Sequence, residues 1–322
     1  MTIRAVRVTR FGGPETLEVT ELDAPAAGDG RLVVDVTAAG VNFADLSRIA
    51  GRYSSAVLLP FVPGSEVVGR IGGRRVVGLS FDGGGFAEKA VLDADAVVDV
   101  PDGVTDEQAL ALLVQGLTAW HLLRGSARLV PGESVVVNAA AGGVGSLAIQ
   151  LAREFGAGRV IAAASTSEKR RLARELGADA AVDSEPAGYA ERVRQANGGH
   201  GADVVLDANG GAAVSAGLEA LAPFGRVISY GDATHEGRPP IDLGLLAERN
   251  VAVAGFWLRP ALALPRGYRE PLAELLELTA RGRLRPITGA QYRLADATQA
   301  FSDLASRRTT GKVTLLVSGP GR

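Results

Sequence analysis

A glycine-rich loop between a strand pattern and a helix pattern constrains the fold of this chain most. Ser134–Asn138 is apolar and rich in valine, Ser146–Phe155 has apolar residues at helical spacing, and Ala139–Gly145 (AAAGGVG) joins them. From Ala140 the loop reads A-x-G-x-x-G, a variant of the fingerprint that binds dinucleotides. Its glycines allow close approach of a pyrophosphate and tight packing of the helix, whose N-terminus offers N–H groups. We expect cofactor contacts from Ala140, Gly142, Gly143, Val144 and Gly145.

The same stretch has two other interpretations. Ser134–Ala152 carries no charge over about the length that a membrane-spanning helix needs, but three glycines and an asparagine interrupt it. We therefore interpret it as strand, turn and helix. A glycine-rich turn that binds nothing is the other alternative.

After Glu133 the chain alternates purely apolar strand patterns with helix patterns. This order predicts a doubly wound parallel sheet covered by helices on both faces. The expected strands are 134–139, 159–164, 180–183, 202–207, 226–232 and 251–258, and the expected helices are 146–155, 167–177, 189–199 and 215–225.

The part before this region reads differently. Residues 1 to about 118 hold glycine, proline and short alternating runs, which predict a small β-barrel or sandwich. After Pro260, a long helix is expected at Glu270–Arg281, and the strand-like runs 284–289 and 312–317 could return to the first domain. With 322 residues, two domains are expected. Their predicted ranges are 1–118 with 261–322, and 119–260.

Composition excludes several function classes. The net charge is -2 and the pI about 6.0, so the whole chain has no electrostatic attraction to nucleic acid or to an anionic membrane. The absence of cysteine excludes disulfides and thiolate chemistry and fits a cytoplasmic location. The first residues alternate apolar and polar types and predict a strand and turn rather than a signal peptide.

The strand that follows the glycine loop decides which dinucleotide fits. NAD sites usually end this strand in an acid that binds the ribose 2′-hydroxyl. Here Arg159–Ala164 is followed by Ser165 and Thr166, with Lys169 and Arg170 in the next helix. Hydroxyls and cations suit a 2′-phosphate, so we expect NADPH, held by Ser165, Lys169 and Arg170. A solvated helix face is the alternative for these cations.

Motifs along nearly the whole chain resemble one family. They are VNFADLSRIAGRY (41–53), LPFVPGSEVVG (59–69), GGFAEKAV (84–91), the stretch 112–152, ASTSEKRRLARELGAD (164–179), GADVVLDANGG (201–211), FGRVISYG (224–231) and RRTTGKVTLLV (307–317). In these the chain resembles the medium-chain dehydrogenase/reductase superfamily, in its zinc-independent quinone oxidoreductase (zeta-crystallin-like) branch. The resemblance implies a GroES-like catalytic domain from both chain ends, an inserted Rossmann domain, and an active site in the cleft between them.

The resemblance also implies an activity and an assembly. The activity would be NADPH-dependent, metal-free hydride transfer to a small-molecule quinone or α,β-unsaturated carbonyl compound. Members commonly form dimers or tetramers, here pairing near Val251–Trp257, so a homodimer is expected.

Site residues follow from the matched positions. Asn42, Tyr53 and Thr118 correspond to positions that line the nicotinamide cleft, with Asn42 as an uncharged donor and Tyr53 as a donor of a hydrogen bond or proton. The resemblance adds further cofactor contacts at Ser184, Asn209, Gly231 and Phe256. Packing alone is the alternative for Tyr53, a turn role is the alternative for Asn42, and Asp45 is expected to order the turn after Asn42.

This chain departs from the family pattern at three places. Ser47 and Ser184 stand where quinone reductases often carry tyrosine, and the loop between Gly69 and Arg75 is shorter. These departures leave the preference for quinones open.

The donor set does not favour zinc. Zinc members use cysteine and histidine, but this chain has no cysteine, and Gly64-Ser65-Glu66 stands where they carry Gly-His-Glu. The chain has three histidines: His121 is expected to be structural, His200 lies in a glycine turn, and His235 lies in a loop that could reach a substrate.

Other enzyme classes fit less well. No tyrosine has lysine four residues later, as short-chain dehydrogenases require, and no G-x-S-x-G elbow is present. A 2-enoyl thioester reductase of polyketide type is the close alternative, because 165–170 (STSEKR) resembles those modules. A non-catalytic NADPH-binding redox sensor or structural protein is the alternative of another class.

Overall fold

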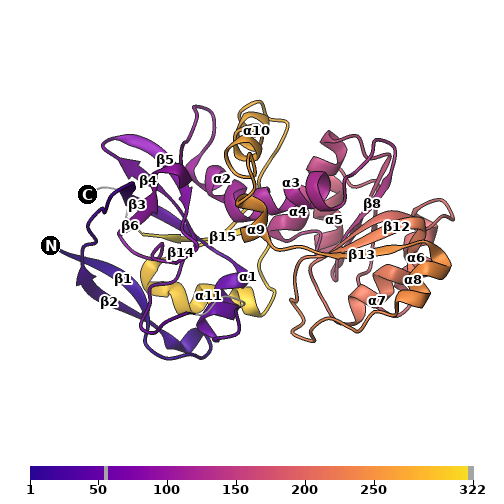
Figure 1. Cartoon of the computed structure of the whole chain (residues 1–322), viewed down its shortest axis with the longest axis horizontal. Helices are drawn as coiled ribbons and strands as arrows, with labels where there is room; N and C mark the ends of the chain where they lie inside the picture. The colour runs from indigo at the N-terminus through magenta and orange to yellow at the C-terminus, as the bar shows by residue number, and fades with distance from the viewer. Residues whose placement is uncertain (54–56, 318–322) are drawn as a thin grey trace. The chain divides into compact units, whose positions relative to one another are not determined.

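The computed structural model describes residues 1–53 and 57–317. It divides into two compact units, Met1–Val114 with Leu272–Arg322, and Gln115–Pro271 (Figure 1). The domain boundaries predicted from the sequence lie after residues 118 and 260. The second unit therefore takes in the start of the helical stretch near Thr118 and the segment 261–271.

The first unit is built mainly of strands. Its strands are β1 (Thr2–Val8), β2 (Leu17–Asp23), β3 (Arg31–Val41), β4 (Glu66–Ile71), β5 (Arg74–Leu79), β6 (Lys89–Asp93), β7 (Val97–Asp99), β14 (Thr288–Arg293) and β15 (Lys312–Leu316). Its helices are α1 (Phe43–Ile49), α2 (Asp106–Ala111), α11 (Ala297–Ala305) and, from Leu272 onward, α10 (Arg269–Ala280). Helix α2 begins at a capping box, because Thr105 Oγ1 accepts from the Gln108 N–H and Gln108 Oε1 accepts from the Thr105 N–H.

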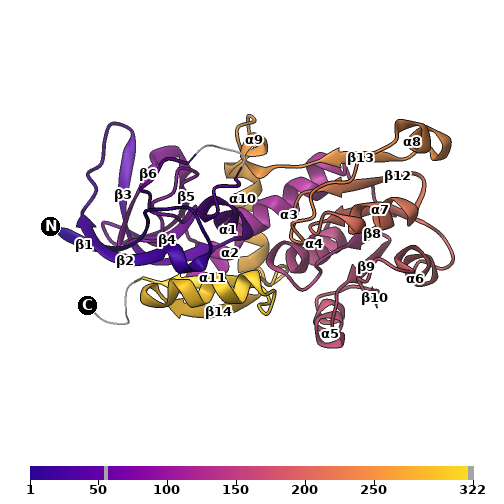
Figure 2. The ribbon, with the colours of Figure 1, turned by 90° about the horizontal axis from the view of Figure 1, so that it is seen from below.

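Strand β3 is the centre of this unit. In the described residues the sheet order is β14-β15-β3-β4-β5-β7, and β6 also pairs with β3. Strand β15 lies antiparallel to β3, with Val313 opposite Val41 and Thr314 opposite Gly40. The last strand of the chain thus pairs with its third strand in one sheet (Figure 1), which confirms the expected return of 312–317, while β1 and β2 form a separate two-stranded sheet (Figure 2). The expected strand at 284–289 is wrong in its bounds, because β14 begins at Thr288.

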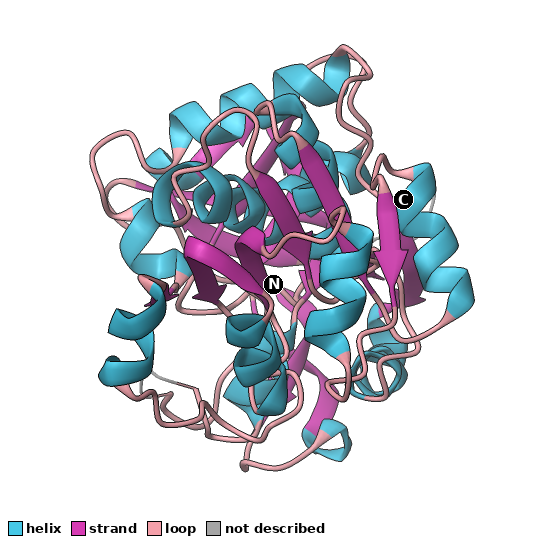
Figure 3. Ribbon diagram, turned by 90° about the vertical axis from the view of Figure 1, so that its right-hand side faces the viewer, coloured by secondary structure: helices cyan, strands magenta, loops and turns pink. Residues whose placement is uncertain are grey.

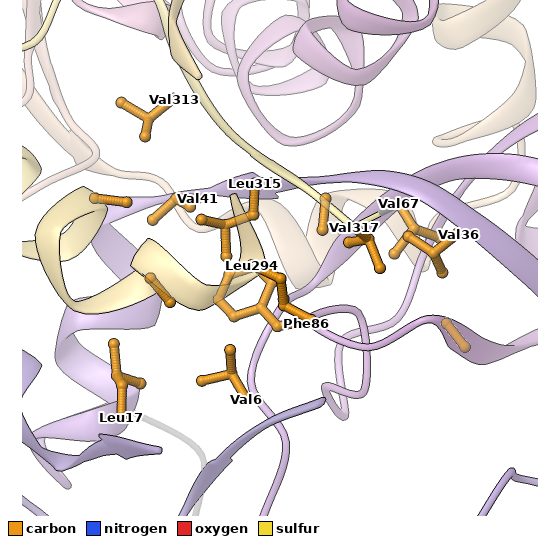
Figure 4. Packing of buried hydrophobic residues seen from close by; sticks show 14 of the residues in the cluster. Val6, Leu17, Val36, Val41, Val67, Phe86, Leu294, Val313, Leu315 and Val317 are labelled. Carbon is orange, nitrogen blue, oxygen red and sulfur yellow. The ribbon is translucent and has the colours of Figure 1, made fainter. Parts of the chain in front are cut away.

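Aliphatic and aromatic side chains from both ends of the chain fill the interior of this unit. Figure 4 shows Phe86 and Leu294 close to Leu315 and Val317. The rings of Phe86 and Phe301 meet edge to face, with centroids 5.8 Å apart. The β-domain expected from alternating runs is therefore completed by the C-terminal helix and strand, as the resemblance implied.

The second unit is an open parallel sheet with helices between its strands. The strands are β8 (Ser134–Val137), β9 (Arg159–Ala163), β10 (Ala180–Val182), β11 (Ala202–Asp207), β12 (Leu221–Ser229) and β13 (Ala252–Gly255). The helices are α3 (Leu117–His121), α4 (Gly143–Glu154), α5 (Ser167–Glu175), α6 (Tyr189–Ala196), α7 (Ala212–Glu219), α8 (Leu243–Arg249) and α9 (Leu258–Leu262), with wider helical turns at 122–126 and, from Gln115 onward, at 112–116. In Figure 3 the strands run between helices.

The strand order confirms the predicted Rossmann fold. All pairs are parallel and the order is β10-β9-β8-β11-β12-β13. Numbered from β8, this is 3-2-1-4-5-6, the order of dinucleotide-binding sheets. The order reverses between β8 and β11, the place where such sheets bind ligands.

Two helix predictions need correction. The helix expected at 146–155 already begins at Gly143, so Gly143, Val144 and Gly145 lie in its first turn. The helix expected at 215–225 ends at Glu219, and 222–225 belong to β12. Pro223 lacks the N–H that a helix needs, and Phe224 has a φ of 64°, so this segment cannot continue the helix. None of the described helices is long and apolar enough to cross a membrane, and Ser134–Ala152 divides into β8, the loop and most of α4.

Candidate active site

In the first unit, Asn42 directs its side chain into a buried polar cluster. It follows β3 and precedes α1, and its backbone N–H donates to Asp45 Oδ2 at 2.9 Å, which confirms that Asp45 orders the turn. The Asn42 amide Nδ2 donates to Glu66 Oε1 at 2.7 Å, and Lys312 Nζ donates to Asn42 Oδ1 at 2.9 Å. Asn42 is therefore more than a turn residue.

Glu66 and Lys312 form a buried ion pair beside Asn42. Their side chains are 0% and 1% exposed, and Lys312 Nζ also donates to Glu66 Oε1. The N–H of Val114 donates to the other carboxylate oxygen, Glu66 Oε2, at 2.8 Å. The negative charge is thus neutralised and hydrogen-bonded, the condition under which a buried carboxylate is tolerated.

Arg48 provides a second buried cation, close to Tyr53. Its Nη1 donates to Ser65 Oγ at 3.1 Å, and its guanidinium carbon lies 5.6 Å from the centre of the Tyr53 ring. This distance suits a cation–π contact, which holds the face of the tyrosine ring. Ser65, the position that holds histidine in zinc members, therefore contacts a cationic side chain of the protein itself.

Asp45 lies beside this cluster with an unusual proton affinity. Burial raises the pKa of its carboxyl to about 6, although the N–H of Asn42 and the charges of Arg48 and Lys312 act in the opposite direction. Among the described residues its Oδ1 has no hydrogen-bond partner.

In the second unit, the glycine loop is shaped by close backbone contacts. A Cβ atom on Gly145 would overlap the carbonyl oxygen of Ala139 and lie 2.9 Å from Ala140 Cα. Glycine there is required for α4 to approach the end of β8. A Cβ on Gly143 would overlap the side-chain amide of Gln115. At Gly142 the nearest atom would be 3.2 Å away, so this position is the most open of the three.

A polar cluster that the sequence reasoning missed lies at the carboxyl ends of β8 and β11. Asn138 Nδ2 donates to Asp207 Oδ1 at 3.0 Å, and the Tyr189 hydroxyl donates to Asn138 Oδ1 at 2.6 Å. The N–H groups of Asn209 and Gly210 donate to the Asp207 carboxylate at 3.3 and 3.0 Å. Burial raises the pKa of Asp207, and also that of Tyr189. The signal in the sequence was a polar residue ending an apolar strand.

The residues expected at the 2′-phosphate gather where β9 and β10 end. Ser165 is exposed after β9, and Thr166 caps α5 by accepting from the Lys169 N–H at 3.2 Å. Arg170 Nη1 donates to the Ala164 carbonyl at 2.8 Å and pairs with Asp183 at 2.9 Å. Ser184 follows Asp183 and is half-buried. Arg170 therefore has a carboxylate partner already.

The remaining expected contacts also lie in the second unit. A Cβ on Gly231 would lie 2.5 Å from the Ala208 carbonyl oxygen, so this residue holds the end of β12 against the loop after β11. Phe256 follows β13, and its N–H donates to the Ser229 carbonyl at 2.9 Å. Thr118 is buried in α3.

The histidines do not form a metal centre in the described residues. His121 is buried, its Nε2 lies 2.7 Å from the Gly267 carbonyl, and its ring stacks on Phe256, which confirms its structural role. Burial lowers its pKa. His200 and His235 are exposed. No group of three histidine, cysteine, aspartate or glutamate side chains in residues 1–53 and 57–317 could hold a metal ion.

Comparison with known proteins identifies the family. A family model described as an alcohol dehydrogenase GroES-like domain matches residues 28–102, and one described as a zinc-binding dehydrogenase matches residues 143–279. The chain is 33% identical to the quinone oxidoreductase-like protein 2 homolog of Nematostella vectensis, over 97% of this chain and 88% of that protein. The chain belongs to the quinone oxidoreductase family of the medium-chain dehydrogenase/reductases.

A solved member of the quinone oxidoreductase family has the same fold. The quinone oxidoreductase of Thermus thermophilus, studied alone and in complex with NADPH, is 40% identical, with a TM-score of 0.88 over 98% of this chain and all of that one.

The chain is also 35% identical to a mycocerosic acid synthase-like polyketide synthase of Mycobacterium tuberculosis, covering 97% of this chain but 15% of that protein. Despite the description of the second family model, the described donors here do not fit zinc.

Proposed function

We propose that this protein reduces a quinone or an α,β-unsaturated carbonyl compound with NADPH and without a metal ion. The observation that carries the proposal is the nucleotide side of the second unit. It combines the Rossmann strand order, a glycine loop at the start of α4, and a β9 end that bears hydroxyls and cations in place of an acid. The solved relative that binds NADPH supports the same cofactor.

The residues of the second unit suit the parts of NADPH in turn. The N–H groups at the start of α4 suit the pyrophosphate, with Ala140, Gly142, Gly143, Val144 and Gly145 shaping the backbone there. Ser165, Lys169 and Ser184 suit the 2′-phosphate, with Arg170 adding charge while paired to Asp183. Asn209, Gly231, Phe256 and Thr118 are proposed to contact the nicotinamide half. When bound, NADPH supplies a hydride from C4 of its nicotinamide ring.

Asn42 and Tyr53 are proposed to act on the substrate oxygen. Among the described residues, Asn42 uses one Nδ2 hydrogen for Glu66, and the second has no acceptor. That N–H can stabilise the negative charge that develops on a carbonyl or quinone oxygen. Tyr53, held against Arg48, is proposed to donate a hydrogen bond or the proton to the same oxygen.

Tyr53→Phe tests this role. We expect kcat to fall about 100-fold or more, because positioned proton donors contribute on the order of 10² to 10⁴. The dissociation constant of NADPH should stay unchanged. Tyr292→Phe is the matched control, since its hydroxyl donates to Asp303 at 2.7 Å elsewhere in the same unit. Wild-type turnover in Tyr53→Phe would show that this tyrosine only packs.

The activity itself is tested on a panel of acceptors. Purified protein with NADPH is offered 1,4-benzoquinone, a simple enone and a crotonyl thioester, each with and without EDTA. We expect turnover of quinone or enone that the chelator leaves unchanged. A chelator-sensitive rate would contradict the metal-free mechanism. Preference for the thioester would favour the enoyl reductase alternative, which is consistent with the similarity to a polyketide synthase. NADPH binding with no acceptor reduced would favour a non-catalytic role.

The assembly is a further proposal. We propose a cytoplasmic homodimer that pairs along β13, the last strand of the parallel sheet. The large apolar side chains of Leu243, Leu245 and Trp257 are exposed near that strand in the second unit. Size-exclusion chromatography with light scattering tests the homodimer, and the mass of a monomer at micromolar concentration would overturn this proposal.

A further inference from the structure

We propose that Lys312 is a positioning residue, which together with Glu66 fixes the Asn42 amide so that its second N–H faces the substrate oxygen. This inference rests on the proposed reductase function. It assigns a role to a charge in the last strand of the chain, 270 residues from Asn42 in sequence. It also explains why two opposite charges are buried at this place.

The hydrogen bonds allow only one orientation of the Asn42 amide. Lys312 Nζ is a donor only and needs the amide oxygen, while the Glu66 carboxylate is an acceptor and needs the amide nitrogen. A flipped amide would place its NH₂ against the ammonium and its oxygen against the carboxylate. The pair therefore decides which atoms of Asn42 remain for a substrate, and the remaining atom is a donor.

The charge of Lys312 also acts on the strength of that donor. An ammonium bound to the amide oxygen draws electron density from the amide nitrogen, which offsets the opposite effect of the Glu66 carboxylate on that nitrogen, and in a buried site both effects are poorly screened. A buried ion pair by itself adds little stability compared with apolar residues of similar size. A functional reason for keeping it is consistent with its complete burial and with its contacts to Asn42.

The neighbouring strand leaves room for the pair. Gly40 of β3 lies opposite Thr314 of β15. A Cβ atom there would lie 2.5 Å from Lys312 Cε and 2.7 Å from Lys312 Nζ, and would overlap Glu66 Oε1. The backbone conformation of Gly40 is one that alanine can adopt, so glycine is needed here for space and not for its conformational freedom. Gly40→Ala therefore displaces the ion pair without deleting any polar group.

The main experiment measures steady-state rates with NADPH and a 1,4-quinone. The variants are the charge-neutral pair Lys312→Met/Glu66→Gln, Asn42→Ala, and all three changes together. We expect the pair to lower kcat about 100-fold or more, as loss of a well-placed donor does, with the NADPH dissociation constant within about twofold of wild type. Because Lys312 acts through Asn42, the triple variant should be no slower than Asn42→Ala.

A matched control removes another ion pair of the same unit. Arg75→Met/Asp106→Asn deletes a pair at 2.7 Å that does not touch Asn42, and should leave kcat at the wild-type level. Should Lys312→Met/Glu66→Gln fail to fold, Gly40→Ala is expected to give the same loss of kcat. Wild-type kcat in the folded variant, or losses that multiply with Asn42→Ala, would overturn the proposal.

A spectroscopic measurement separates this inference from the proposed function. The chain has five asparagines, so ¹⁵N-asparagine labelling gives five side-chain NH₂ signals, and Asn42→Ala assigns one of them. In the wild type the Asn42 hydrogen that is bonded to Glu66 should exchange slowly, and in Lys312→Met/Glu66→Gln or Gly40→Ala this protection should be lost. An unchanged signal refutes the positioning role even if the enzyme is active. A protected signal in a protein that reduces no acceptor refutes the proposed function alone.

Discussion

At the residue scale, the buried carboxyl of Asp45 makes stability depend on pH. Its pKa is about 6 in the folded protein and 3.8 in its ordinary state. Well below pH 3.8 the carboxyl is protonated in both states, and the raised pKa does not change the stability. Between pH 3.8 and pH 6 the unfolded chain loses this proton while the folded protein keeps it, and above pH 6 the folded protein contains a buried charge. The free energy of unfolding therefore falls as the pH rises through this range, by about 3 kcal/mol in full.

Asp45→Asn tests this pH dependence. The amide oxygen can still accept from the Asn42 N–H but carries no charge. The free energy of unfolding of the variant relative to wild type should rise between pH 4 and pH 7 by up to about 3 kcal/mol, measured by urea unfolding. The same series on Asp99→Asn, a mostly exposed carboxyl of this unit, accounts for the general effect of removing one negative charge. A difference that does not vary with pH would contradict the assignment.

Lys169 is expected to determine the choice between the two nicotinamide nucleotides. Its backbone position is fixed in the first turn of α5 by the Thr166 cap, next to Ser165. Lys169→Ala should weaken NADPH binding about tenfold, the value of one charge-assisted hydrogen bond to phosphate, and leave NADH binding unchanged. Arg171→Ala is the control, because Arg171 is exposed and pairs with Glu175 on the helix surface. If titration shows that Lys169→Ala weakens the binding of NADPH and NADH equally, Lys169 does not bind the 2′-phosphate.

At the scale of elements, two glycines at the start of α4 are expected to have different roles: Gly145 allows packing, and Gly142 allows the cofactor to bind. A methyl group at Gly145 would meet the backbone of Ala139 and Ala140, which cannot yield, so Gly145→Ala should lower the free energy of unfolding by about 2–3 kcal/mol. A methyl group at Gly142 would meet only the Ala139 carbonyl oxygen, at 3.2 Å. Gly142→Ala should therefore lose less stability than Gly145→Ala, and it should weaken NADPH binding. Denaturant unfolding and cofactor titration of both variants measure the contrast, and equal losses of stability would contradict it.

Local pattern was enough to predict most elements but not their pairing. The apolar strands after Glu133 and the glycine loop predicted the parallel sheet, because both signals lie within short segments. The helix at 212–219 was misplaced, because helical spacing in 215–225 outweighed Pro223 in that prediction. Strand β15 was expected to return to the first domain, but its register against β3 could not be predicted from local residues.

The buried cluster around Asn42 shows the same limit. Asn42, Glu66 and Lys312 each stand in a motif that resembles the family, but the motifs do not show that the three side chains meet. Their contact requires β15 to pair with β3 at Val313 and Val41, and β3 to pair with β4 at Ala39 and Val67. A lone charge beside apolar strand residues signals burial with a partner, but the partner becomes known only from the fold. Asn138 and Asp207 were missed for the same reason.

At the scale of the whole molecule, the chain leaves the first unit at Val114 and returns to it at Leu272, and both tryptophans lie between. Trp120 and Trp257 therefore report on the second unit, whereas far-ultraviolet circular dichroism reports on the whole chain. If NADPH binds the second unit, it stabilises that unit by mass action. At a concentration about 100 times the dissociation constant, this amounts to about 2.7 kcal/mol.

This stabilisation should appear as a rise of about 5–10 °C in the thermal midpoint seen by tryptophan fluorescence, given about 2–4 °C per kcal/mol for a unit of this size. NADH at the same concentration should give a smaller rise, because it lacks the 2′-phosphate, and Lys169→Ala should bring the effect of NADPH closer to that of NADH. Recording both signals shows whether the first unit melts with the second or separately. If NADPH shifts only the circular dichroism transition and leaves the tryptophan transition in place, the cofactor does not bind where the glycine loop and the end of β9 predict.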